Sequence, residues 1–135
     1  MKGYWNKPDA TKEAIQDKWF FSGDAGYFDE EGYLYIHDRV KDMIVSGGEN
    51  IYPAEVENAL MSNPEIIDAA VIGIPDEKWG ESVKGFVVLK DGAELSEVDI
   101  ISYVKSQIAG YKCPKTINFI DMLPRNPSGK VLRRE

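Results

Sequence analysis

Cysteine and histidine are almost absent from this sequence: its 135 residues include one of each, Cys113 and His37. A single cysteine excludes an internal disulfide framework and is typical of proteins in a reducing compartment, so we expect a cytoplasmic location. One cysteine and one histidine also argue against a zinc site built from these residues, because a structural zinc site needs four ligands. We therefore predict no metal site in this chain.

Long apolar runs and an excess of positive charge are lacking as well. No stretch approaches the roughly 20 apolar residues of a membrane-spanning helix, and the first residues lead into polar sequence rather than the apolar centre of a signal peptide. The chain carries 16 basic and 23 acidic residues, a net charge of −7. This balance argues against nucleic acid as a partner.

The composition that remains is globular, with 43% hydrophobic and 29% charged residues, and the length predicts one domain with a remnant of another. Residues 1–38 combine a short helix ending at Ile15, a strand at 19–21 and a hairpin with strands at 27–28 and 33–36. A lone hairpin is marginally stable in water. We therefore expect residues 1–38 to pack against something else rather than to form an independent domain.

The pattern from residue 43 onward predicts a compact α+β unit. Its expected elements are a strand at 43–45, a loop at 46–50, a helix from Pro53 to Asn63, strands at 69–72 and 83–89, a helix from Ser96 to Gly110 and a strand at 116–120. Ser96 and Asp99 resemble a capping box, and the apolar stripe of that helix is predicted to be Val98, Ile101, Val104 and Ile108. This order predicts a small two-layer domain, with a short mixed sheet of about three strands packed with helices and preceded by the β-hairpin.

Residues 111–135 form a basic tail, with six basic residues against two acidic ones. Such a tail fits a solvated charged end as well as a site for a phosphorylated small molecule. Its last residues, Pro124 to Glu135, are expected to form an exposed loop, and the segment Pro124-Arg125-Asn126-Pro127-Ser128-Gly129-Lys130 shares Gly-Lys with phosphate-binding P-loops. A P-loop requires Gly where Pro124 stands and Ser or Thr where Val131 stands, so that interpretation is excluded. Judged alone, Lys130 is an ordinary exposed lysine.

Two further segments could bind a ligand or only make turns. Ser46-Gly47-Gly48-Glu49-Asn50 contains two glycines that permit either a strand-to-helix turn or a close backbone approach to a ligand. Ser22-Gly23-Asp24 could accept two hydroxyl hydrogen bonds, as from a ribose, or simply form a turn. Neither segment decides between these alternatives by itself.

Taken in order, these segments resemble the superfamily of AMP-forming acyl-CoA synthetases, luciferases and adenylation domains, and the resemblance covers essentially the whole chain. Ala25 stands where that superfamily usually has leucine. The segments that carry the resemblance are Gly3-Tyr4-Trp5 with Pro8 and Thr11, Ser22-Gly23-Asp24-Ala25-Gly26, Asp38 to Ile44, Ser46 to Glu57, and Pro124 to Lys130.

The resemblance implies a two-step reaction: a carboxylate attacks the α-phosphate of ATP to give an acyl-adenylate and pyrophosphate, and the thiol of CoA then displaces AMP. It also implies three parts of the chain. Residues 1–38 correspond to the end of a large N-terminal domain, 39–42 to a hinge, and 43–135 to a C-terminal domain that swings between the two steps.

For the first step, the resemblance implies that Lys130 reaches the substrate carboxylate and the α-phosphate. A compact ammonium with three donors suits that crowded negative charge. Asp24 is expected to hold the ribose hydroxyls, and Arg39 to join it at the nucleotide. Lys41 occupies the hinge position, where the change in backbone torsion matters more than side-chain chemistry.

For the second step, the resemblance implies that Gly48 lines the channel for the pantetheine arm of CoA and that Trp79 lies near the CoA nucleotide. A partly buried core tryptophan is the alternative for Trp79. Tyr111 is expected near adenine, and Lys112 and Lys115 near the phosphates. Cys113 stands where some relatives carry a basic residue.

The superfamily's phosphate loop, magnesium carboxylate and acyl pocket lie in a part that does not occur in these residues. ATP, CoA and a carboxylic acid are therefore expected as substrates, with Mg²⁺ bound outside this chain. We expect the chain alone to be inactive. A fatty acid is the first expectation and an aryl or small acid the second. The Gly-Gly-Glu-Asn-Ile-Tyr-Pro loop favours CoA over a carrier-protein thiol. A non-catalytic module that binds CoA or a nucleotide is the remaining alternative.

Overall fold

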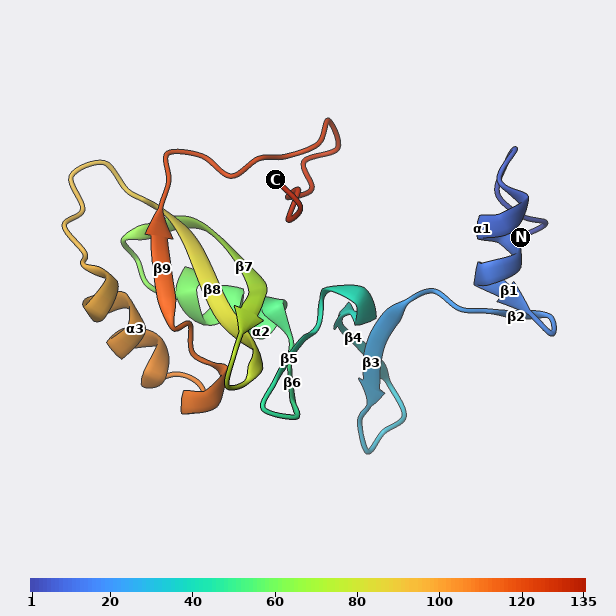
Figure 1. The fold of residues 1–135 in the computed structure, drawn as a ribbon, viewed down its shortest axis with the longest axis horizontal. Coiled ribbons are helices and arrows are strands. Elements are labelled where there is room, and N and C mark those ends of the chain that lie inside the picture. The colour runs from blue at the N-terminus through green and yellow to red at the C-terminus, as the bar shows by residue number, and fades with distance from the viewer. The chain divides into compact units, whose positions relative to one another are not determined.

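The computed structural model describes residues 1–135 and divides into two compact units, Met1–Lys41 and Asp42–Glu135. A short 3₁₀ helix, η1 (Val40–Asp42), includes the residues on both sides of that division (Figure 1). None of the helices is long and apolar enough to cross a membrane.

The first unit consists of one short helix and two small antiparallel sheets. Its elements are α1 (Pro8–Ala14), β1 (Ile15–Gln16), β2 (Trp19–Phe20), β3 (Asp24–Phe28) and β4 (Leu34–Arg39). The strands pair as β1 with β2 and β3 with β4. The predicted hairpin is therefore confirmed, although its strands extend further, to Asp24 and Arg39, which are cross-strand partners.

The turn of this hairpin is organised by Asp29. Its Oδ1 accepts hydrogen bonds from the amide of Glu31 at 3.0 Å and from that of Tyr33 at 2.9 Å. Bonding from the Tyr33 amide is the main reason that the pKa of Asp29 lies below its usual value. Gly32, at φ +86°, supplies the positive φ that the turn requires.

The second unit is a mixed five-stranded sheet with two helices. Its elements are β5 (Ile44–Ser46), β6 (Glu49–Ile51), α2 (Pro53–Met61), β7 (Ile66–Asp76), β8 (Gly80–Leu89), α3 (Glu97–Lys105), a 3₁₀ turn η2 (Gly110–Lys112) and β9 (Thr116–Phe119). The order is β6-β5-β8-β7, and β9 also pairs with β8. Only the β8–β9 pair is parallel. The predicted α+β class and mixed sheet are confirmed, but the prediction of about three strands is wrong.

Strand β6 is the one strand of the second unit without a counterpart among the expected strand segments, and most of it lies in the segment predicted as a loop. Gly47 and Gly48 both have positive φ, +60° and +87°, and this is the conformation of a two-residue hairpin turn. The turn pairs Ser46 with Glu49 and Ile44 with Ile51. Ile51 is fully buried, so the strand contributes one core side chain despite its polar sequence.

The hydrophobic core lies between one face of the sheet and the helices α2 and α3. Along β7 and β8 the core residues Ala69, Val71, Val83 and Val87 share one face of the pleated strands, whereas Ala70 and Ser82 are buried on the other face. The capping box at Ser96 and Asp99 is confirmed. The predicted stripe of α3 is partly wrong, because Val98 is 71% exposed and Ile100 is fully buried. The core residues are Ile44, Ile51, Val56, Ala59, Leu60, Ile66, Ala69, Val71, Val83, Val87, Ile100, Val104, Cys113 and Ile117.

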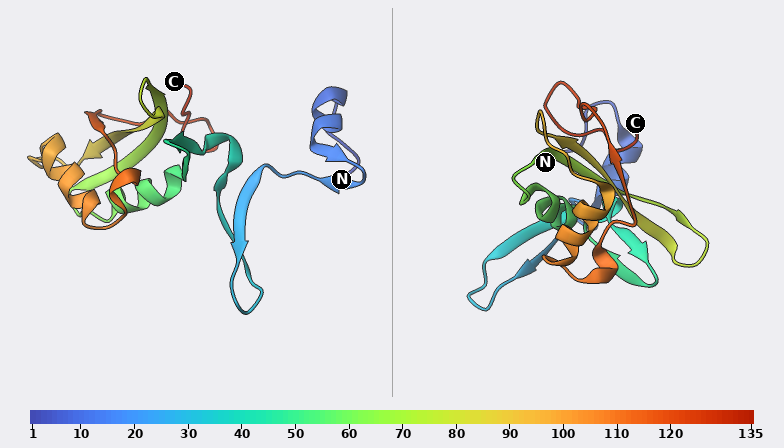
Figure 2. Two further views of the ribbon diagram at one scale, coloured as in Figure 1. Left: turned by 60° about the horizontal axis from the view of Figure 1, so that its bottom comes forward. Right: turned by 90° about the vertical axis from the view of Figure 1, so that its left-hand side faces the viewer.

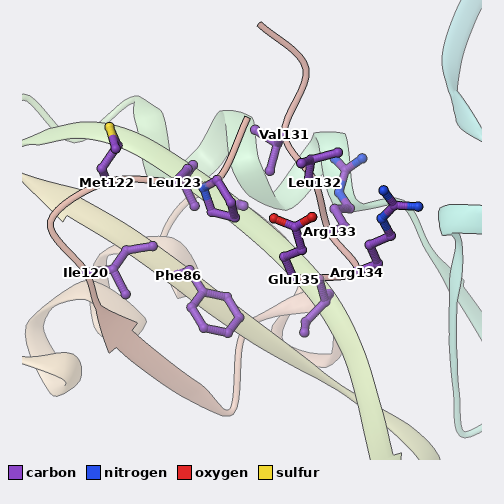
Figure 3. Close-up of a pocket in the computed structure, with 12 residues that line it drawn as sticks. Phe86, Ile120, Met122, Leu123, Val131, Leu132, Arg133, Arg134 and Glu135 are labelled. Carbon is purple, nitrogen blue, oxygen red and sulfur yellow. The ribbon is translucent and has the colours of Figure 1, made fainter. Parts of the chain in front are cut away.

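The opposite face of the sheet is covered by the C-terminal segment, which follows β9 (Figure 2). A cavity of about 350 Å³ lies between this segment and the sheet residues Ala70, Ile72 and Phe86. In Figure 3, Phe86, Ile120 and Leu123 lie on one side of this cavity and residues 131–135 on the other. The prediction of an exposed loop from Pro124 therefore holds for Lys130 but not for Val131–Arg133, which are half-buried.

Candidate functional site

Lys130 lies at the end of a closed turn formed by residues 126–130. The backbone amide of Asn126 donates to the carbonyl of Lys130, and the amide of Gly129 donates to the carbonyl of Asn126, both at 2.9 Å. Gly129 has φ +84°, and a Cβ added there would meet nothing within 4 Å. The glycine is therefore required by backbone conformation, not by close packing. Lys130 itself is exposed.

The positive charge of the basic tail is largely neutralised by acidic residues from elsewhere in the second unit. Four of its six cations are paired, and Lys130 and Arg134 have no ion pair. The bonded pairs are Lys112–Glu55 at 2.7 Å, Lys115–Asp76 at 2.7 Å, Arg125–Asp68 at 2.5 Å and Arg133–Glu57 at 2.8 Å. The Lys130 ammonium is thus available to an anionic ligand, whereas most of its basic neighbours already have carboxylate partners.

Asp24 and Arg39 are brought together in the first unit, as cross-strand partners at the ends of β3 and β4. Arg39 Nε lies 2.9 Å from Asp24 Oδ1, and Arg39 NH1 donates to the carbonyl of Ser22 at 3.0 Å. Ser22 Oγ accepts a hydrogen bond from the Asp24 amide at 3.2 Å. The Asp24 carboxylate therefore has oxygen lone pairs left for hydroxyl donors, beside a fixed guanidinium. Lys41 lies two residues further on, in η1.

Trp79, Lys115 and the Gly47-Gly48 turn come together at the start of β8. The Gly47 amide donates to the Trp79 carbonyl at 2.8 Å, and a Cβ added to Gly47 would lie 2.8 Å from the Trp79 ring. The ring is 43% exposed and lies 4.6 Å from Lys78 Nζ and 5.7 Å from Lys115 Nζ. Trp79 is thus partly buried, but it lies outside the hydrophobic core and borders a cationic surface.

Asp76 organises this cluster. Its Oδ2 accepts from Lys115 Nζ at 2.7 Å, and its Oδ1 accepts from the amides of Lys78 and Trp79, both at 3.0 Å. These bonds, the one from Lys115 first, lower the pKa of Asp76 to about 2. The carboxylate therefore stays ionised and fixes Lys115 next to Trp79.

Tyr111 and Lys112 lie together on η2, three to four residues before Lys115. Lys112 Nζ lies 5.7 Å from the Tyr111 ring and donates to both carboxylate oxygens of Glu55 at 2.7 and 2.8 Å. The Glu55 bond raises the pKa of Lys112. Cys113 is buried in the core, and burial raises the pKa of its thiol, so Cys113 is not a surface residue for phosphate.

Several residues of the site were not predicted from the sequence. Asp76, Glu55 and Asp68 pair with predicted or neighbouring basic residues across 39 and 57 positions of sequence. Gly47, not Gly48, is the glycine that touches Trp79; a Cβ on Gly48 would meet nothing within 4 Å. The Gly-Gly pair was the only sequence signal of this contact. No group of three His, Cys, Asp or Glu side chains is arranged to hold a metal ion.

Comparison with known proteins identifies relatives of the whole chain. Residues 55–130 match the AMP-binding enzyme C-terminal domain family. The chain is 51% identical over 133 residues to a long-chain-fatty-acid–CoA ligase of Mycobacterium tuberculosis, covering 98% of this chain and 26% of that protein. It is also 51% identical over 135 residues to a fatty acid–[acyl-carrier-protein] ligase of Streptomyces coeruleorubidus, covering 100% of this chain and 26% of that protein.

Among solved structures, the chain is similar to the o-succinylbenzoate CoA synthetase of Bacillus subtilis in complex with its acyl-adenylate intermediate. The TM-score is 0.94 at 44% identity, over 100% of this chain and 28% of that one. The same enzyme has a structure with ATP and magnesium ion, to which this chain is 43% identical with a TM-score of 0.91. The chain thus spans about a quarter of the length of the curated relatives that it matches.

Proposed function

The chain belongs to the AMP-binding enzyme C-terminal domain family, and from this premise we propose that it is the C-terminal part of an AMP-forming carboxylate–CoA ligase. The enzyme joins a carboxylic acid to ATP, releasing pyrophosphate, and then transfers the acyl group to the thiol of CoA, releasing AMP and the thiol proton. Residues 1–38 are the end of the large domain, 39–42 the hinge and 43–135 the mobile domain. A cytoplasmic location stays an expectation from the cysteine content.

One observation carries this proposal: within the matched segment, Lys130 presents an unpaired, exposed ammonium at the end of a closed turn. In the first step, negative charge accumulates between the attacking carboxylate and the α-phosphate, and a fixed ammonium stabilises that charge. Asp24 would accept the ribose hydroxyls while Arg39 keeps its carboxylate oriented through the 2.9 Å ion pair. Lys41 would absorb the change in backbone torsion when the domain turns.

The second step is assigned to a different set of residues, which surrounds Trp79, Tyr111 and the Gly47-Gly48 turn. The exposed Trp79 ring, flanked by two ammonium groups, suits the stacking of an adenine ring and the charge of its phosphates. Tyr111 and Lys112 add a second aromatic–cation pair, and the Gly47-Gly48 turn leaves space beside Gly48 for the narrow pantetheine arm. CoA is thus the proposed acceptor, and ATP, CoA and an acid are the proposed partners, with Mg²⁺ held outside this chain.

The acid is proposed to be a fatty acid, with an aryl acid as the alternative. The relatives named above act on both kinds of acid at 51% and 44% identity to this chain. Sequence identity in this part of the enzyme therefore reflects the two reaction steps that the relatives share rather than the acid that each one activates.

Replacing Lys130 by Ala in the complete ligase tests the assignment. Loss of one preorganised donor lowers the rate of an electrostatically stabilised step by about 10²- to 10³-fold. We expect that loss in acyl-adenylate formation, measured by pyrophosphate release. Thioester formation from supplied acyl-adenylate should be retained. Equal loss of both steps would contradict the division of roles between the two sets of residues.

A carrier-protein thiol is the second candidate acceptor, because one relative at 51% identity is a fatty acid–[acyl-carrier-protein] ligase. The two acceptors differ in the adenine nucleotide, which only CoA has. Lys115→Ala should therefore raise KM for CoA while leaving KM for a carrier protein unchanged. Transfer to the carrier protein but not to CoA by the unaltered enzyme would favour the second candidate.

The chain alone is proposed to be inactive, since the acyl pocket and phosphate loop belong to a different part of the enzyme. Formation of acyl-AMP by the purified 135-residue chain would refute this. Calorimetry with CoA, ATP and AMP also tests a non-catalytic binding module. Submillimolar affinity for CoA without any contribution to catalysis in the complete enzyme would support that module instead.

A further inference from the structure

Asn126 holds the Lys130 turn closed through its side chain. The Asn126 Oδ1 atom accepts hydrogen bonds from the amide of Ser128 at 3.0 Å, the hydroxyl of Ser128 at 2.8 Å and the amide of Lys130 at 2.9 Å. Three donors converge on this one atom, so the amide group is oriented with its oxygen inward. The position of the Lys130 backbone is therefore fixed by a side chain four residues earlier.

Arg125 ties the same turn to the sheet. Its NH1 group donates to the carbonyl of Gly129 at 2.7 Å, and its NH2 group donates to Asp68 Oδ2 at 2.5 Å. Asp68 belongs to β7 and lies on the same face of that strand as Ala70 and Ile72. One planar guanidinium thus bridges the residue before Lys130 and a rigid strand, which a single ammonium could not do with the same geometry.

The chain is also anchored directly after Lys130. The amide of Leu132 donates to the carbonyl of Pro124 at 2.8 Å, and Arg133 bonds to Glu57 at 2.8 Å on α2. Val131 and Leu132 pack along the cavity that Phe86 and Leu123 also line (Figure 3). Both flanks of the turn are therefore fastened to the second unit, while the Lys130 side chain is left exposed.

We propose that Asn126 and Arg125, with Asp68 as the anchor of Arg125, are positioning residues for the adenylation lysine. This inference rests on the proposed function, since it assigns these residues to the Lys130 step. They hold the Lys130 backbone so that only the flexible side chain must be ordered when the substrate phosphate arrives. A displacement of about 1 Å in a positioned group can cost on the order of 10²-fold in rate.

The test uses the complete ligase with each half-reaction measured separately. Asn126→Ala should lower kcat for acyl-adenylate formation by roughly 10- to 100-fold, with KM for ATP and acid unchanged and thioester formation from supplied acyl-adenylate retained. Asn126→Asp keeps an oxygen acceptor at that position and should restore the closed turn. Arg125→Lys and Asp68→Asn should give smaller losses in the same step. Arg134→Gln removes one positive charge from an unpaired arginine and should leave both steps unchanged.

Amide hydrogen exchange supplies a readout apart from activity. In the 135-residue chain, the amides of Ser128 and Lys130 should exchange faster after Asn126→Ala and return to the original rate with Asn126→Asp. The exchange rates of the other amides in the second unit should not change. If Lys130→Ala lowers adenylation but Asn126→Ala leaves its kcat within twofold of the original, the inference is overturned and the proposed function stands. If Lys130→Ala has no effect, both are overturned. Equal loss of both half-reactions in Asn126→Ala, together with a lower melting temperature, would also overturn the inference.

Discussion

The two units of this chain differ in what holds them together. None of residues 1–41 is buried, whereas the second unit contains every fully buried side chain of the molecule. Yet the first unit is rich in large apolar residues: Trp5 is 90% exposed, Trp19 74% and Phe28 70%. Hydrogen-bonded strands without a buried face gain little stability.

This contrast separates a unit with a buried hydrophobic core from a unit without one. In the second unit, apolar side chains alternate with the pleat and point toward α2 and α3. In the first unit, Tyr27 stacks on Tyr35 at 5.3 Å between ring centres, but both residues remain about half exposed. Exposed aromatic residues of this kind are typical of a surface that contacts a partner.

The largest effect is expected from dividing the chain. Residues 42–135 alone should unfold cooperatively at nearly the same temperature as residues 1–135, because the whole core is retained. Residues 1–41 alone should show no cooperative transition. Circular dichroism melting curves of the three proteins measure this. A large loss of stability on removing 1–41 would show that the first unit contributes to folding of the second.

A matched pair of leucine substitutions sharpens the contrast at single residues. Leu60 is fully buried in α2, and Leu34 is 55% exposed in β4. Leu60→Ala should lower the free energy of unfolding by about 2–5 kcal/mol through the cavity that it leaves. Leu34→Ala should change it by less than about 0.5 kcal/mol. Urea denaturation of the 135-residue chain compares the two, and equal effects would contradict the division.

The same contrast explains which elements could be predicted from the sequence. Strands β7 and β8 contain apolar runs bounded by turn residues, and helix α2 has an apolar face after Pro53, so all three were predicted. Strand β6 was not, because Glu49 and Asn50 are polar and the strand is defined by its hairpin turn. Val98 was assigned to the core because it is three residues before Ile101. At about 100° per residue, however, it lies off the face that Ile100 and Val104 share.

For the site, residues in short motifs could be predicted from the sequence, but their ion-pair partners from distant parts of the chain could not. Lys130, Asp24 and Arg39 stand in short motifs, and the structure pairs Asp24 with Arg39. The charge count of residues 111–135 predicted either a solvated charged end or a site for a phosphorylated small molecule. It could not reveal that Asp68, Glu55 and Asp76 neutralise three of those charges, because these acids lie 39 to 57 positions away.

A smaller effect is expected from the helix caps of the two units. Helix α3 begins with a capping box in which Ser96 Oγ accepts from the Asp99 amide at 3.2 Å and Asp99 Oδ2 accepts from the Ser96 amide at 3.0 Å. Helix α1 follows Lys7 without a side-chain cap. Ser96→Ala should cost about 1 kcal/mol of unfolding free energy, and Lys7→Ala should cost nothing measurable. Thermal unfolding monitored by circular dichroism distinguishes the two variants. An unchanged melting temperature for Ser96→Ala would show that the cap is dispensable.

The smallest effect concerns the ionisation of Asp76, which should not depend on the presence of the first unit. The pKa of Asp76 is lowered to about 2, first by the hydrogen bond from Lys115 and then by the Trp79 amide. Because the pKa is lowered on folding, the stabilisation is present above the ordinary pKa of 3.8 and is lost as the pH falls through about 2. No pH dependence from this pair is therefore expected between pH 5 and 8.

Carboxyl chemical shifts of Asp76, followed by NMR during acid titration, measure this pKa directly. It should be the same in residues 1–135 and 42–135, since Asp76, Lys115 and Trp79 all belong to the second unit. Lys115→Ala should raise it toward 3.8, while the amides of Lys78 and Trp79, both 3.0 Å from Oδ1, keep it below that value. A pKa that changed on removing residues 1–41 would mean that the first unit alters the proposed CoA surface, and the two units could no longer be treated as independent.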